Sequence, residues 1–306
     1  MRWIIWVVLS VLAGCQTASI KEAGVESVQS ELGLPEWQSP RERDHSRVGQ
    51  IVDLRTGEQV AIEAMLAELA SASIVLLGEK HDNPDHHHLQ LWLLQAIQAR
   101  RAQGSVVLEM LTLDQQDRVS SVQQTVRAGA QSDNLAQALQ WHKGWDWQLY
   151  GELVSYILKQ RYPLLASNLN RDALLSIYRN PPELTGVKST SPTVTQRLSE
   201  HIREAHCNKL PDTQLPAMLA VQQQRDRSMA KVLLEAAKPT LLIAGAYHVR
   251  YDLGVPLHLE DLYEAEKLQQ RVLIFAEADQ DVETQSADFV WYTPAVAERD
   301  YCAELL

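Results

Sequence analysis

The sequence predicts an α/β protein, a single domain with a largely parallel central sheet and helices on both faces. Four short apolar runs of β-forming residues are spread along the chain, and each ends in a polar segment. Continuous apolar runs of this length are typical of strands buried on both faces of a parallel sheet. Helical patterns separate them, which places helices on both faces of the sheet. The runs are 74–77, 106–108, 164–166 and 240–244.

The remaining elements follow in chain order from residue 51. Residues 51–53 and 58–60 flank Thr56-Gly57 and predict a small hairpin. Asn83-Pro84 supplies an N-cap and a first-turn proline for a helix that runs to about residue 103. The second buried strand is expected to end at Glu109 and the third near Asn168. Other helices are expected at 61–70, 114–127, 147–161, 192–206 and 215–237, and late strands at 272–276 and 289–292.

The N-terminus has the features of a bacterial lipoprotein signal. Arg2 and an apolar stretch to residue 12 precede Leu12-Ala13-Gly14-Cys15. The stretch is too short to cross a bilayer of about 30 Å as a helix, which argues against a signal anchor. We therefore expect residues 1–14 to be removed and Cys15 to carry acyl chains such as palmitate, which hold the domain on a membrane. Gln16 favours the outer membrane, by resemblance to lipoproteins of Gram-negative bacteria.

Composition and charge indicate where the folded domain begins and which class of partner is excluded. Residues 15–50 are rich in Ser, Glu, Gln and Arg and are interpreted mostly as a tether, so that the folded domain is 51–306. The formal net charge of −11 argues against a nucleic-acid partner.

Beyond Cys15, Cys207 and Cys302 could form one disulfide in an oxidising periplasm; the alternative is two unpaired buried thiols. Trp141, Trp145 and Trp147 near His142 form either a lid or, as we favour, a packing corner.

Polar groups directly follow the buried strands and are expected to build one site. In open α/β sheets, ligands bind outside the carboxyl ends of the strands. The alternative is that these groups only cap the sheet. The segments are Gly78-Glu79-Lys80-His81, Leu108-Glu109-Met110, Ser167-Asn168-Leu169-Asn170 and Gly245-Ala246-Tyr247-His248.

Two carboxylates and two imidazoles at these strand ends could hold a metal. Glu79 and His81 are two residues apart, so their side chains leave the same face of an extended strand. Glu109 and His248 complete a set suited to a divalent metal or to general acid and base work. Alternatively, each glutamate caps a helix and each histidine is bonded to backbone carbonyls in the core.

Two helices carry further candidates. His86 lies three residues before Leu89 on an apolar stripe and should face inward near Glu79 and His81, whereas the next two histidines should face solvent. Asp226, together with Gln222, falls on the buried stripe of the 215–237 helix, and a buried carboxylate needs a partner. That partner is either His248 or an arginine such as Arg171 or Arg250.

Together these segments resemble the ChaN-like haem-binding lipoprotein family, with similarity from about residue 51 to residue 302. This family belongs to a wider group that includes Tiki-type metalloproteases and erythromycin-esterase-like hydrolases. The order and spacing of the strings are more specific than any one of them. They are Gly78-Glu79-Lys80-His81-Asp82-Asn83, His87-His88, Asn168-Leu169-Asn170-Arg171, Gln222 with Arg225-Asp226 and Met229-Ala230, Gly245 with His248-Val249-Arg250, Gly254-Val255-Pro256, and Thr293-Pro294 with Cys302.

The resemblance implies haem binding for iron uptake at the outer membrane. It further implies cofacial haems enclosed by a homodimer, a tyrosine iron ligand with a histidine nearby, and an outer-membrane haem receptor as a partner. Phenolate is a hard oxygen donor that suits ferric haem. Tyr247 is the first choice of ligand, followed by Tyr178 and Tyr251. The other expected haem contacts are His248, His81, Glu79 and His86, supported by Asn168, Asp226 and Arg250.

A metal-dependent hydrolase is the competing hypothesis. In it, Glu79, His81, Glu109 and His248 hold a divalent metal or move protons while an activated water attacks an ester or amide. A third hypothesis, a structural envelope lipoprotein, leaves the polar strand ends unexplained.

Overall fold

The computed structural model describes residues 33–129, 134–263 and 268–304. From Leu34 onward these residues belong to one compact unit. The predicted signal segment, Cys15 and the first half of the predicted tether lie outside the described residues. No helix among the residues described is long and apolar enough to cross a membrane.

A sheet of eight strands in the described part of the chain forms the centre of the molecule, in the order β2-β1-β8-β7-β3-β6-β4-β5. Strands β3 to β8 run parallel to one another, and β1 pairs antiparallel with both β2 and β8. The predicted fold class is therefore confirmed, and the predicted hairpin extends the sheet. The strands are β1 (Ile51–Asp53), β2 (Glu58–Gln59), β3 (Ile74–Glu79), β4 (Ser105–Thr112), β5 (Leu164–Asn168), β6 (Thr240–Gly245), β7 (Gln270–Glu277) and β8 (Phe289–Thr293).

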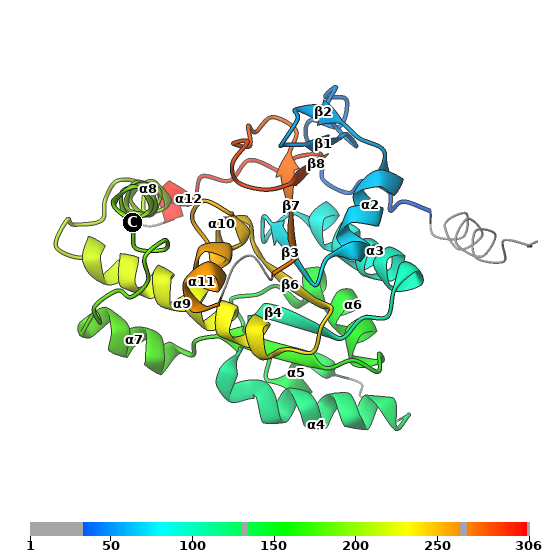
Figure 1. The fold of residues 1–306 in the computed structure, drawn as a ribbon, viewed down its shortest axis with the longest axis horizontal. Coiled ribbons are helices and arrows are strands. Elements are labelled where there is room, and N and C mark those ends of the chain that lie inside the picture. The colour runs from blue at the N-terminus through cyan, green and yellow to red at the C-terminus, as the bar shows by residue number, and fades with distance from the viewer. Residues whose placement is uncertain (1–32, 130–133, 264–267, 305–306) are drawn as a thin grey trace, which may run out of the picture. The chain divides into compact units, whose positions relative to one another are not determined.

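Helices lie on both sides of this sheet (Figure 1). Alternate residues of β3 face opposite sides, so Ile74 and Leu76 join Met229 and Leu233 of α9 in one apolar core. The helices are α2 (Ile62–Ser71), α3 (Pro84–Arg100), α4 (Gln116–Arg127), α5 (Leu135–Leu139), α6 (Trp147–Leu158), α7 (Arg171–Arg179), α8 (Pro192–Ala205), α9 (Leu215–Glu235), α10 (Ala246–Val249), α11 (Val255–Leu262) and α12 (Tyr301–Glu304), with a 3-10 turn, η1 (Leu113–Gln115).

Residues 34–50, which we predicted to belong to the tether, pack on the domain instead. Ser39 is buried, and its hydroxyl donates to Asn83 Oδ1 at 3.0 Å while its backbone N–H donates to Asp85 Oδ2 at 3.0 Å. Arg41 forms a bridge with Ala295 near the other end of the chain. The prediction was wrong because this segment is fixed by polar contacts to distant residues, which leave no apolar periodicity in the sequence.

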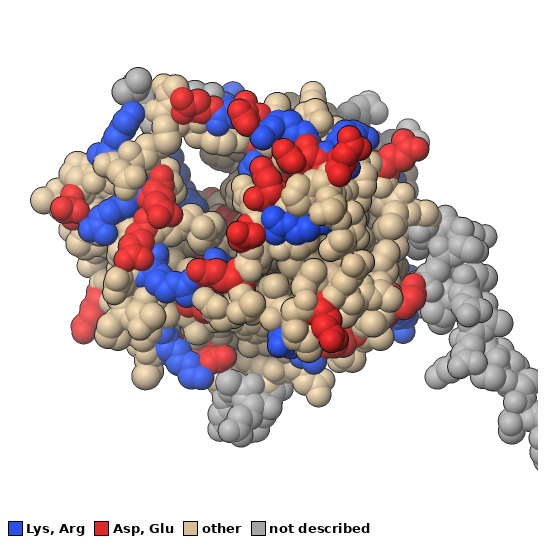
Figure 2. Space-filling view, turned by 90° about the horizontal axis from the view of Figure 1, so that it is seen from above, with Lys and Arg blue, Asp and Glu red and all other residues tan. Residues whose placement is uncertain are grey.

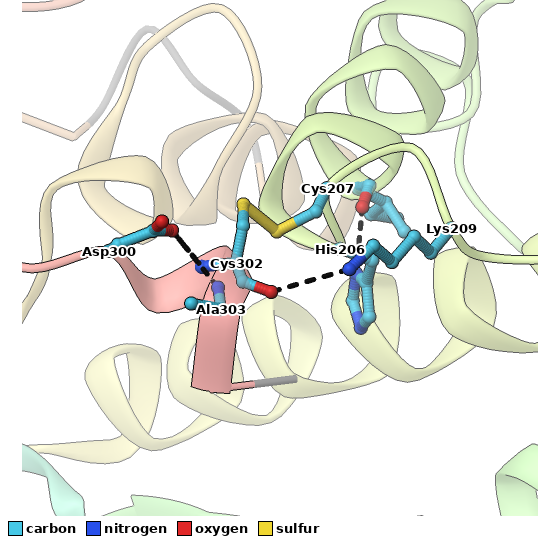
Figure 3. Close-up of a disulfide and its surroundings, with 7 residues drawn as sticks. His206, Cys207, Lys209, Asp300, Cys302 and Ala303 are labelled. Carbon is cyan, nitrogen blue, oxygen red and sulfur yellow. Dashed lines mark hydrogen bonds between the residues drawn. A yellow bond between two sulfur atoms is a disulfide. The ribbon is translucent and has the colours of Figure 1, made fainter. Parts of the chain in front are cut away.

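The predicted disulfide is present and joins Cys207, just after α8, to Cys302 on α12 (Figure 3). The two residues are 95 positions apart, and their Cα atoms are 5.7 Å apart. Lys209 Nζ donates to the Cys302 carbonyl oxygen at 3.4 Å. The bridge therefore fastens the C-terminal segment to α8, and the alternative of two unpaired buried thiols is wrong.

Candidate functional site

The carboxyl ends of β3 and β6 and residue Glu109 of β4 lie next to one another and bring the predicted site residues together. The strand β4 was expected to end at Glu109 but continues to Thr112. Glu79 at the end of β3 pairs with Gly245 at the end of β6, and β6 in turn pairs with β4, which carries Glu109. His248 follows on α10, the short helix directly after β6. Three of the four predicted strand ends thus share one site. The fourth, Asn168 on β5, lines a different cavity.

Glu79 is the centre of the first group of polar contacts and is almost fully buried. The Tyr150 hydroxyl donates to its Oε1 at 2.5 Å, His81 Nδ1 donates to Oε1 at 2.9 Å, and Gln90 Nε2 donates to Oε2 at 2.6 Å. Burial opposes ionisation, but His87 and His81 outweigh it and hold the pKa of Glu79 well below its ordinary value. Glu79 is therefore an ionised carboxylate that accepts from three side chains.

His87 was expected to face solvent, and this prediction was wrong. It is buried, with Nε2 donating to the His81 carbonyl at 3.0 Å and Nδ1 3.2 Å from Glu79 Oε2. A carbonyl only accepts, so Nε2 carries a proton, and Nδ1 facing a carboxylate favours a second one. Burial lowers the pKa of His87, but Glu79 raises it above the ordinary value. The ring is enclosed because Tyr150 of α6 packs against it.

His248 is the centre of the second group and bridges two carboxylates. Its Nε2 lies 3.3 Å from Glu109 Oε1, and its Nδ1 hydrogen bonds to Asp226 on α9. Burial lowers the pKa of His248, but Glu109 and Asp226 raise it to about 10. Conversely, the pKa of Glu109 falls to about 2 despite burial, because His248 lies beside it and Gly245 N–H donates to Oε2 at 2.8 Å. His248 is thus an imidazolium. The sequence left open whether Asp226 pairs with His248 or with an arginine, and the structure pairs it with His248.

The two groups meet at His81. A side-chain carbon on Gly245 would lie 2.8 Å from His81 Nε2 and 3.7 Å from Glu109 Oε2, so the imidazole and the second carboxylate both adjoin this glycine. Glycine suits this position because a methyl group here would force the His81 ring to shift. The other face of the site is closed by Trp145, whose ring centroid is 4.8 Å from that of His81.

His86 faces inward, as predicted, and is neutral. Lys80 N–H donates to its Nδ1 at 2.9 Å, which places the ring proton on Nε2, 3.0 Å from Thr293 Oγ1. Burial is the main reason that the pKa of His86 falls to about 3. Both ring nitrogens are already bonded, so His86 shapes the wall of the site.

A cavity of about 470 Å³ opens over these groups. This is within the size range of small-molecule sites. Figure 2 shows a deep hollow in the molecule beside the part that Figure 1 assigns to α8. The predicted residues that line the cavity are Glu79, His81, His86, Tyr247, His248 and Arg250, and the lining also includes His201, Ile274 and Phe275.

Tyr247 is the predicted haem ligand that reaches this cavity. The residue is 39% exposed, and its ring stacks on His201 of α8 with centroids 3.3 Å apart. Burial raises the pKa of Tyr247, and Arg250, whose guanidinium lies 5.6 Å from the ring centroid, opposes that rise. Among the described lining residues, neither Tyr178 nor Tyr251 occurs. Tyr251 donates instead to Asp288 at 2.7 Å.

The four residues predicted to hold a metal are paired with one another in this structure, Glu79 with His81 and Glu109 with His248. Glu79, His81, Glu109 and His248 do converge, but in the described part of the chain no group of three His, Cys, Asp or Glu side chains is arranged to hold a metal ion. The physical reason is that the acids and imidazoles pair with each other. A protonated His248 has no free nitrogen lone pair to give to a metal.

Sequence reasoning missed two residues of the first group. Tyr150 lies on the buried side of α6, and from the sequence its ring is indistinguishable from an ordinary core side chain. Gln90 lies one turn after His86 on α3 and is also buried. A glutamine at a buried helical position was the available signal, since a buried amide needs a partner. The tryptophans form the packing corner that we favoured, with Trp141 against Trp147 and Tyr150. Arg250 pairs with Asp252 and Glu283 rather than with Asp226.

Comparisons with known proteins agree with the resemblance seen in the sequence. The family described as "Haem-binding uptake, Tiki superfamily, ChaN" matches residues 65–259. The structure of ChaN of Campylobacter jejuni with cofacially bound haem is 28% identical, covers 83% of this chain and 98% of that chain, and has a TM-score of 0.74. No curated protein matches the chain.

Two more distant structures have much lower similarity. An erythromycin esterase, EreC, is 15% identical, covers 79% of this chain and 77% of its own, and has a TM-score of 0.41. A Bacillus cereus protein is 14% identical, covers 71% of this chain and 68% of its own, and has a TM-score of 0.38.

Proposed function

Because the chain belongs to the haem-binding uptake family of the Tiki superfamily that includes ChaN, we propose that it binds haem in the cavity lined by Tyr247. The confirmed family favours haem binding over the metal-dependent hydrolase considered from the sequence. The pairing of His248 with two carboxylates also argues against that hydrolase, since it occupies an expected metal ligand.

One observation carries this proposal: a phenol reaches a cavity that opens over buried acids and imidazoles already paired with one another, Glu79 with His81 and Glu109 with His248. Bound haem supplies an iron centre that accepts an anionic oxygen ligand. Tyr247 is the residue that would hold the iron; burial raises the pKa of its phenol, and Arg250, close to the ring, opposes that rise. His201 stacks flat on the same ring and restricts its rotation.

The buried groups below Tyr247 give the cavity a fixed floor. Glu79 and Glu109 are ionised, and His248 is protonated beside Glu109. Burial lowers the pKa of His87, but Glu79 raises it above its ordinary value, so carboxylates and imidazoles stabilise each other's charged forms in the floor. We assign these residues to shaping and orienting the site, with His81 as the floor residue that is most open to the cavity: its side chain is 40% exposed.

We further propose that the protein is an outer-membrane lipoprotein for haem and iron uptake. The support is the signal segment before Cys15, with Gln16 after it. A homodimer that encloses two haems is proposed from the family resemblance, and an outer-membrane haem receptor is the proposed partner. The dimer interface and the receptor contact would both lie on surfaces of the chain outside the cavity.

Haemin titration followed by absorption spectroscopy tests haem binding. The wild-type chain should shift the Soret band and saturate, and Tyr247→Phe should alter the spectrum because it removes only the ligand oxygen. Tyr263→Phe is the matched control, since Tyr263 is exposed and does not line the cavity. An unshifted wild-type spectrum would contradict the proposed function. A change with Tyr178→Phe but not with Tyr247→Phe would show that the ligand is misassigned.

A further inference from the structure

A second cavity, of about 870 Å³, lies beyond the carboxyl ends of β4 and β5. It shares no lining residue with the first cavity. Its wall contains the segment Asn168-Leu169-Asn170-Arg171 and also Arg225, which the sequence analysis singled out and the haem site does not use. Trp145 lines it as well, and the edge contact of this ring with His81 forms the partition between the two cavities.

Most acceptor groups of this cavity are already engaged. Gln115 Oε1 accepts from Thr112 N–H at 2.8 Å and from Thr112 Oγ1 at 3.0 Å. Hydrogen bonds from Thr112 and Asn170 hold the pKa of Asp114 below its ordinary value. Asn168 Oδ1 accepts from Leu169 N–H at 2.8 Å. The remaining carboxylate, Asp172, is exposed on the first turn of α7.

Three donor side chains of this cavity have unused capacity: Arg171, Arg225 and Asn168. Within the described residues, Arg225 Nε is buried without any hydrogen-bond acceptor, and Arg171 is exposed at the start of α7. The Asn168 amide keeps its NH₂ group after its oxygen is used. Two guanidinium groups and an amide donor therefore line one cavity whose own acceptors are mostly occupied. A buried donor without an acceptor is costly, so an acceptor-rich ligand would be favourable.

We propose that the second cavity binds an oxyanion, a carboxylate or phosphate group of a small molecule, between Arg171 and Arg225. Guanidinium is suited to this role because its planar fork of N–H donors matches both groups in a bidentate manner. Asn168 supplies a further donor, and Trp145 forms the apolar wall. This site is separate from the haem cavity, and its test does not depend on haem.

Separate titrations of the full chain with inorganic phosphate and with succinate test the proposal, at constant ionic strength kept with chloride. Tryptophan fluorescence and thermal unfolding are the two measurements. We expect a saturable response to at least one anion, and the anion that binds identifies the group. Arg171→Gln with Arg225→Gln should weaken binding by roughly tenfold or more, since charge-assisted hydrogen bonds are lost. Trp145→Phe should abolish the fluorescence response but keep the thermal one.

Arg179→Gln is the matched control, because Arg179 is exposed at the other end of α7 and does not line the cavity. It should bind the anion like the wild type. The single variant Arg171→Gln should fold in any case, because Arg171 is exposed. Absence of saturable binding to both anions, or equal binding by the double variant, would overturn the proposal. Loss of the haemin spectrum in the double variant would also overturn it, because the cavity would then belong to the haem site.

Discussion

Replacing Asp226 by asparagine tests the charge assignment of His248. This change keeps the size of the side chain and removes the charge that, with Glu109, raises the pKa of His248 from 6.5 to about 10. A folded-state pKa above the unfolded value gives stability that is complete below pH 6.5 and is lost as the pH rises towards 10. A shift of this size corresponds to about 5 kcal/mol at 1.36 kcal/mol per pKa unit, as an upper limit for a coupled group.

We therefore expect Asp226→Asn to lower the free energy of unfolding by roughly 3–5 kcal/mol at neutral pH, as for other broken buried pairs. The expected loss should shrink as the pH approaches 10, because His248 is then losing its proton in the wild type as well. Urea unfolding of both proteins at several pH values between about 6 and 10 measures this difference. Both proteins contain the same other histidines, so the difference between their free energies of unfolding reports the titration of His248.

Glu235→Gln on the exposed end of the same helix is the matched control and should leave the unfolding curve unchanged at every pH. A difference between wild type and Asp226→Asn that is the same at all pH values would refute the reasoning. So would a variant as stable as Glu235→Gln. In either case His248 would be neutral in the folded protein, and its contact with Asp226 would be an ordinary hydrogen bond.

Three other changes give separate tests. Cys302→Ser should lower the free energy of unfolding by roughly 2–5 kcal/mol, because it frees a long loop, and a reducing agent should then have no further effect on the variant. Cys15→Ser should move the protein from membranes to the periplasmic fraction; retention on membranes after a salt wash would place the anchor elsewhere. Gly245→Ala should cost about 1–3 kcal/mol and weaken haemin binding, because its methyl group would meet His81 Nε2 at 2.8 Å. Gly33→Ala, with open space around it, should do neither.

The sequence by itself determined the sheet and the position of the site. A buried parallel strand has an apolar run that needs no knowledge of its neighbours, so β3, β4, β5 and β6 could be placed from local pattern alone. Parallel strands also present their carboxyl ends at one edge. Glu79, Glu109 and His248 could therefore be grouped before any contact was known, and the resemblance of their segments supplied the family.

The tertiary structure decided what these groups do to one another. Whether Glu109 and His248 hold a metal or pair as ions depends on a third carboxylate, Asp226, which comes from a helix that precedes β6 in the chain. Similarly, Glu79 is ionised despite burial because His87 of α3 and His81 hold its pKa down, while Tyr150 of α6 donates a hydrogen bond to it. Charge interactions change over a few ångströms in a buried site, and sequence spacing gives no such distances between separate elements.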